Sequence, residues 1–302
     1  MMYQYSIMDI STIKENLQDY CLDPFVVDSV NKLVELLNIP PNRPKQNKKE
    51  KNTLDDDGKW AKREIFKTTK IEKKEGIEEK LDNFRGILNK MVSNNYEEKK
   101  EKIMDSIIAL LDTQEEQVNA YEKIISCFYI VIINNSIYSN LYAKLYANIM
   151  EQHVVFEENA YTFIEKYNES LEKIRYVDPD QDYDAYCIIN KENHQRKSLL
   201  KFIVNSVEIE IYSFNEILII VNNLFEKLNK DLKEKEHVHT NEEIIEILFI
   251  ILQEGKQLIM KEVCKYDIIE KIKYYSTLKV SEFGGFSNRM KFKMMDLFDL
   301  YK

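Results

Sequence analysis

Residues that could bind a metal ion are the most chemically suggestive feature of this sequence. Every second residue from Asp178 to Asp184 is an aspartate, as are several oxygen ligands of calcium-binding loops. Such a loop needs Gly at its sixth position and Glu at its twelfth. Counted from Asp178, these positions hold Tyr183 and Ile189, so we predict a solvent-exposed acidic loop instead.

Other residues with metal-binding or catalytic side chains also lack a complete pattern. His237 and His239 could hold a metal, but no further ligand is near them in the sequence. The sequence contains no phosphate-binding glycine loop, no G-x-S-x-G and no HExxH. We therefore predict no catalytic site, no metal and no cofactor, and hence a protein that is not an enzyme. The four cysteines lie far apart in the sequence, without the spacing of metal ligands, which indicates buried free thiols in a reducing compartment. They are Cys21, Cys127, Cys187 and Cys264.

The scarcity of glycine and proline predicts an all-α fold. The 302 residues include only 6 Gly and 5 Pro, and four of the five prolines precede residue 45, so that Pro179 is the single proline after it. Sheets need frequent tight turns and therefore recruit both residues, whereas helices joined by polar loops do not. The chain is long enough for one large or two ordinary domains.

Periodic apolar residues and capping signals indicate where helices lie. Ile103, Ile107, Leu110 and Leu111 form one stripe of an amphipathic helix. Asp23-Pro24 is typical of a helix start, and Thr-x-x-Glu capping boxes follow at residues 113–116 and 240–243. Segments 176–186 and 232–239 are the predicted loops. The spacing favours successive antiparallel helix pairs, in a solenoid or an irregular bundle.

Charge divides the chain into three predicted parts: a small helical appendage (1–38), a basic linker or tether (39–75) and a main domain (76–302). Residues 43–75 contain 12 Lys and Arg against 7 Asp and Glu, a local charge of +5. Because the whole chain carries −9, the remainder carries −14. An acidic domain is poorly suited to tight nucleic-acid binding over its whole face. It is better suited to binding a basic protein surface while the tether touches RNA.

Four segments resemble the middle domain of eukaryotic translation initiation factor 4 gamma. Residues 84–90 (FRGILNK) are similar to R-x-I/L-L-N-K-L at the start of the family's first helical repeat. Residues 287–300 (SNRMKFKMMDLFDL) are similar to its closing helix, S-S-R-I-x-F-x-L-x-D. Residues 138–145 (YSNLYAKL) and 196–203 (RKSLLKFI) match two positions between them. The resemblance implies a HEAT-type solenoid over residues 76–302.

The resemblance implies one helicase-contacting surface on the first helix pair. Leu88, Met91 and Tyr96 match positions where family members carry Leu, Leu and Phe, which contact the DEAD-box helicase of the initiation machinery. The Met and Tyr substitutions preserve bulk. The alternative is that these residues belong to the core of the first helix pair.

The last helix corresponds to the family's second helicase-contacting region. Arg289, Lys291 and Lys293 form a basic edge of this helix, and Phe292 is predicted to point elsewhere. The resemblance assigns Arg289, Lys291 and Phe292 to the helicase contact. The alternative is that Arg289 caps a helix or forms a salt bridge within its own domain.

The N-terminal third holds two further candidate sites. Trp60, the single tryptophan, loosely matches a family element that reaches the other lobe of the helicase. An aromatic residue among cations is also typical of RNA stacking, although Trp60 could instead pin the tether to its own domain. The pattern of Tyr20, Phe25 and Val26 resembles the family's contact with a cap-binding subunit, but that motif is helical throughout whereas Asp23-Pro24 predicts a helix start. The predicted RNA-binding residues are Lys59, Trp60, Lys62, Arg63 and Lys67.

The resemblance implies a translation initiation scaffold that binds and activates a DEAD-box RNA helicase on mRNA, with weak non-specific RNA binding and a cap-binding protein as a further partner. A related scaffold in splicing, mRNA decay or ribosome assembly stays open, as does a helical adaptor with no RNA role. The sequence shows no signal peptide or membrane span, which predicts a cytoplasmic protein. Abundant Ile, Lys, Asn and Tyr are typical of AT-rich coding sequences, such as those of protists or of large DNA viruses acting in the host cytoplasm.

Overall fold

The computed structural model describes residues 23–36, 76–112 and 117–302. All regular structure in these ranges is helical, which confirms the all-α prediction, while the finer prediction of a HEAT-like solenoid stays a prediction. The chain divides into two units, residues 1–70 and 71–302. The described helices are α2 (Pro24–Leu36), α3 (Ile77–Asn89), α4 (Tyr96–Leu111), α5 (Gln117–Asn134), α6 (Ser139–Gln152), α7 (Val154–Glu172), α8 (Tyr183–Glu208), α9 (Phe214–Asp231), α10 (Val238–Glu254), α11 (Lys256–Ile259), α12 (Lys265–Thr277) and α13 (Asn288–Tyr301), with short 3-10 turns η1 (Ser93–Asn95), η2 (Lys235–His237) and η3 (Val280–Glu282).

In the first unit the structure describes α2 alone. The helix begins at Pro24, as predicted, because the Asp23 side chain accepts a hydrogen bond from the Phe25 N–H at 2.8 Å. Phe25 and Val26 are exposed on its first turn. Since Asp23 stands outside the helix, the segment is not helical throughout and does not fit the cap-binding motif. Tyr20 lies outside the described residues.

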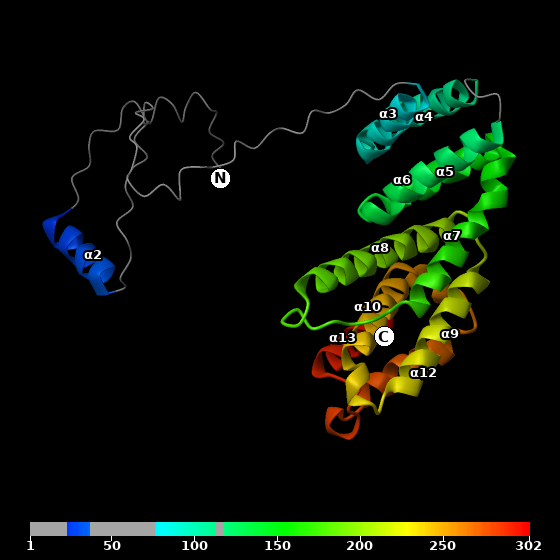
Figure 1. The fold of residues 1–302 in the computed structure, drawn as a ribbon. Coiled ribbons are helices and arrows are strands. Elements are labelled where there is room, and N and C mark those ends of the chain that lie inside the picture. The colour runs from blue at the N-terminus through cyan, green and yellow to red at the C-terminus, as the bar shows by residue number, and fades with distance from the viewer. Residues whose placement is uncertain (1–22, 37–75, 113–116) are drawn as a thin grey trace, which may run out of the picture. The chain divides into compact units, whose positions relative to one another are not determined.

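In the second unit the helices follow one another from α3 at one end to α12 and α13 at the other (Figure 1). Helices close in sequence pack together in several places: α3 on α4, α7 on α8, α9 on α10 and α12 on α13. The 26-residue α8 contacts α5, α6 and α10 as well as α7. It therefore forms the central helix of this unit.

The core of the second unit is one continuous cluster of buried apolar side chains from α3 to α13. The predicted stripe on α4 belongs to it, with Ile103, Ile107 and Leu110 fully buried. Tyr146 stands at its aromatic centre and donates a hydrogen bond to the Phe156 carbonyl at 2.9 Å, so its hydroxyl is satisfied away from water. Its ring contacts those of Phe128, Phe156, Phe163 and Phe202.

A close backbone contact fixes the start of α13. A Cβ on Gly285 would lie 2.5 Å from the Asp231 carbonyl oxygen, so only glycine fits here. The Gly285 N–H donates to the Leu232 carbonyl at 3.0 Å, and the buried Asn241 amide donates to the Gly285 carbonyl at 3.0 Å. These bonds hold the segment before α13 against the start of α10.

None of the described helices is long and apolar enough to cross a membrane.

Candidate functional site

The surface of α13 is set by the helix's amphipathic spacing. Met290, Met294, Leu297 and Tyr301 face the core, and the Tyr301 hydroxyl donates to the Leu252 carbonyl of α10 at 2.7 Å. The opposite side therefore faces solvent. We call Arg289, Lys291, Phe292, Lys293 and Met295 the α13 surface.

The basic edge of the α13 surface is tied to α10. Arg289 and Lys293 both pair with Glu246, at 2.7 and 2.8 Å. Burial alone would raise the pKa of Glu246, but the hydrogen bonds and charges of these two cations together hold it below its ordinary value. Arg289 thus forms salt bridges within its own domain, as the alternative interpretation proposed. It also stays largely exposed, so a partner could still reach it.

Phe292 is the exposed apolar residue of this surface. Its side chain is 61% exposed, and Met295, three residues further along the helix, is 42% exposed. Lys291 lies beside it and forms no ion pair with any residue in the described ranges. A partly exposed aromatic residue next to cations is typical of a protein contact. The structure thus places Phe292 on the surface together with Arg289 and Lys291.

The first helix pair differs from the prediction. Leu88 and Met91 are both 0% exposed, because they close the end of α3 against the core. In this structure they are core residues and not direct partner contacts, and a partner could reach them only if the helix pair opened. Tyr96 is half-buried, and its hydroxyl accepts a hydrogen bond from the Asn148 amide at 3.1 Å. Burial raises the pKa of Tyr96 to about 12.

A groove of about 550 Å³ nevertheless runs along the outside of this helix pair. Asn83 and Gly86 line it from α3 and Lys90 lines it from the turn that follows, whereas Leu88 faces the core. Lys99 and Lys102 line it from α4, and both pair with Glu98. The motif at residues 84–90 thus indicated this helix pair as a candidate contact, but it did not indicate which face of the pair is open to a partner.

Comparison of the sequence with models of known protein families finds no match. Comparison with curated proteins finds none either.

The two histidines do not form a metal site together. His239 stacks on Tyr176, with ring centroids 3.9 Å apart, while His237 lies 3.2 Å from Glu234. Among the described residues, Glu234, Glu236 and His237 alone bring three ligand atoms within 4.8 Å of one another, all at the surface. Sequence reasoning considered His237 but missed the two glutamates beside it.

The remaining candidate residues have structural explanations or lie outside the described ranges. Asp182 caps α8 by accepting from the Ala185 N–H at 2.9 Å, and Asp178 accepts from the Asp180 N–H. Cys127 is buried as predicted, but Cys187 is exposed and Cys264 is only partly buried, so the prediction of buried thiols is wrong for these two residues. The tether residues Lys59, Trp60, Lys62, Arg63 and Lys67, together with Cys21, lie outside the described residues.

Proposed function

We propose that this chain is a translation initiation scaffold that binds and activates a DEAD-box RNA helicase on mRNA. The four segments that resemble the middle domain of initiation factor 4 gamma support the proposal. They fall on α3, α6, α8 and α13, in the order in which the family has them. A HEAT-type solenoid is the architecture that goes with this function.

The observation that carries the proposal is the exposure of Phe292. Helix α13 packs against both α10 and α12, and its buried apolar side chains Met290, Met294 and Leu297 face the core. The ring nevertheless faces solvent beside Lys291, at the position where the resemblance implies a helicase contact. Partner binding would remove this apolar area from water, which favours association.

In the proposed mechanism the scaffold performs no chemistry. The α13 surface and the groove on α3 and α4 would contact the two lobes of the helicase and hold them near their closed arrangement. The scaffold would then shift the helicase population towards its RNA- and ATP-bound state. The tether, with Trp60, would supply weak and salt-sensitive RNA contacts, since the rest of the chain is acidic.

Truncating the exposed apolar residues tests this proposal. We expect Phe292→Ala with Met295→Ala to weaken binding to the purified initiation helicase about ten- to several-hundred-fold, the usual range for central apolar anchors. Isothermal titration calorimetry measures the change. Because both side chains are exposed, the melting temperature should stay within a few degrees of that of the unchanged protein.

The matched control removes two apolar side chains elsewhere that are even more exposed than Phe292 and Met295. Ile137→Ala with Val263→Ala takes away exposed apolar area at the segment after α5 and before α12. This variant should bind the helicase normally. Equal binding by the Phe292 variant and this control would rule out the α13 surface as the contact.

A further inference from the structure

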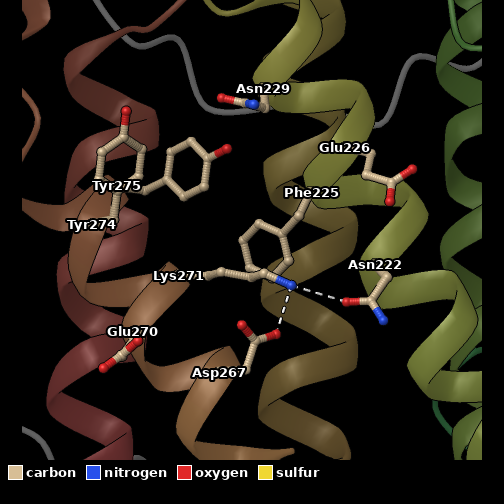
Figure 2. Close-up of a pocket in the computed structure, with 9 residues that line it drawn as sticks. All are labelled: Asn222, Phe225, Glu226, Asn229, Asp267, Glu270, Lys271, Tyr274 and Tyr275. Carbon is tan, nitrogen blue, oxygen red and sulfur yellow. Dashed lines mark hydrogen bonds and ion pairs between the residues drawn. The ribbon is translucent and has the colours of Figure 1, made fainter.

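A groove of about 440 Å³ lies between α9 and α12, apart from the α13 surface (Figure 2). Its most buried lining residues are Phe225 and Tyr275, whose rings stack with centroids 5.7 Å apart and planes 15° apart. Tyr274 lies beside them, about half-exposed, and meets Tyr275 edge-on at 5.1 Å. The groove therefore has an aromatic wall within reach of solvent.

The groove already holds one cation of the protein itself. The Lys271 ammonium lies 2.7 Å from an Asp267 carboxylate oxygen and 3.1 Å from the Asn222 side-chain oxygen. It also lies 5.7 Å from the centre of the Phe225 ring. Figure 2 shows this arrangement, in which a carboxylate, an amide oxygen and an aromatic face converge on a positive charge. The groove is thus chemically suited to cations.

Two more carboxylates line the groove without a cation of their own. Glu226 lies on α9 and Glu270 on α12, and neither forms an ion pair with any residue that the structure describes. Both are exposed. With Asp267 they outnumber the one ammonium of Lys271, so the lining is acidic. Such a lining attracts a further cation and repels the phosphates of nucleic acids.

We propose that this groove binds an arginine side chain from a basic segment of a partner protein. A guanidinium is planar and can stack on Tyr274 while its N–H groups donate to Glu270, one helical turn earlier on α12. Glu226 lies on the opposite wall, on α9 (Figure 2), where it can pair with a second cation of the same basic segment. A lysine ammonium is a point charge and would reproduce the ion pair but not the stacking. The size of the groove is within the range of sites that enclose small groups. This surface is distinct from the proposed helicase contact and does not depend on it.

Peptide binding to the full chain tests the inference. The probe is a fluorescent seven-residue peptide of alternating glycine and arginine, compared with its lysine and citrulline counterparts by fluorescence anisotropy. We expect the arginine peptide to bind at least tenfold more tightly than the citrulline peptide, which keeps the shape and loses the charge. It should also bind several-fold more tightly than the lysine peptide, and Tyr274→Ala should remove that preference whereas Tyr274→Phe retains it.

Charge-matched variants distinguish binding in the groove from general attraction between a basic peptide and an acidic protein. Glu226→Gln with Glu270→Gln should weaken binding of the arginine peptide at least tenfold. Glu158→Gln with Glu165→Gln on α7 changes the net charge equally, at exposed glutamates without ion pairs among the described residues, and should change binding less than twofold. Equal losses in the two variants would overturn the inference, as would equal binding of the arginine and lysine peptides or the absence of binding by the arginine peptide.

Discussion

Replacing Leu88 by Ala is expected to lower the free energy of unfolding by about 2 to 5 kcal/mol, the range for a fully buried leucine. The side chain is 0% exposed, and its removal leaves a cavity where α3 meets the core. The Leu88 carbonyl accepts hydrogen bonds from the Met91 N–H at 3.1 Å and from the Tyr142 hydroxyl at 3.4 Å. The loss of packing would therefore also loosen the turn after α3. Urea denaturation followed by circular dichroism measures the change.

Asn89→Ala is the matched control, because Asn89 is the next residue of α3 and is exposed. It should change the free energy of unfolding by less than about 0.5 kcal/mol. A Leu88→Ala protein that is as stable as the control but no longer binds the helicase would restore Leu88 as a direct contact. It would contradict the burial described above.

Replacing Arg196 by Met is expected to cost about 3 to 5 kcal/mol, the usual penalty for removing one partner of a buried ion pair. The Arg196 side chain is 2% exposed and lies 4.0 Å from Glu243 of α10. It also donates hydrogen bonds to the Ser170 carbonyl at 3.0 Å and to the Asn193 side chain at 2.6 Å. One guanidinium thus joins α7, α8 and α10, and methionine replaces its bulk but none of its hydrogen bonds.

A double variant separates charge from packing in this cluster. Glu243→Gln removes the carboxylate that Arg196→Met deprives of one of its two cations, so the double variant should recover part of the loss. Because Glu243 also pairs with Lys197 at 3.1 Å, the recovery should be incomplete. Chemical denaturation of the four proteins gives the coupling free energy. Strictly additive losses would show that Arg196 acts through Ser170 and Asn193 alone.

Comparison with the Glu243→Gln variant also predicts how the free energy of unfolding depends on pH. Burial raises the pKa of the Glu243 carboxyl, and the nearby Lys197 and Arg196 charges only partly oppose this effect. Because its pKa is raised, the folded protein holds this proton more tightly than the unfolded chain does. The stability that this gives is fully present below pH 4.5, the ordinary pKa, and is lost as pH rises through the folded-state pKa. Stability relative to Glu243→Gln should therefore fall as pH rises above about 4.5.

The sequence was sufficient to predict the helical class, because the whole chain has only 6 Gly and 5 Pro and a single proline, Pro179, follows residue 45. The helix start at Pro24 was also predictable, since Asp23 next to it in the sequence is the residue that caps the helix. The predicted cap at Thr240 was wrong. The chain enters α10 from the η2 turn and the helix begins at Val238, so the Thr240 hydroxyl donates to the His237 carbonyl instead.

The candidate sites were less predictable, because exposure depends on packing between helices that are far apart in sequence. Leu88 and Phe292 are both apolar residues within motifs, yet the first is buried and the second exposed. Leu81, Phe84 and Leu88 recur at helical spacing and are the buried residues of α3, so periodicity favoured a buried Leu88 and the motif match was misleading. The α9–α12 groove could not be found from the sequence, since Glu226 and Glu270 come from two helices that pair only in the fold. Arg196 falls within a motif, but its burial depends on α7 and α10.

Helicase turnover tests the central claim most directly. The steady-state ATPase rate of the purified initiation helicase is measured with single-stranded RNA, with and without a saturating amount of this protein. The account predicts no ATP hydrolysis by the protein alone and a several-fold faster rate by the helicase when the protein is present. The Phe292→Ala, Met295→Ala variant should lose the stimulation at the same concentration. An unchanged helicase rate at saturating protein would contradict the proposed role in translation initiation.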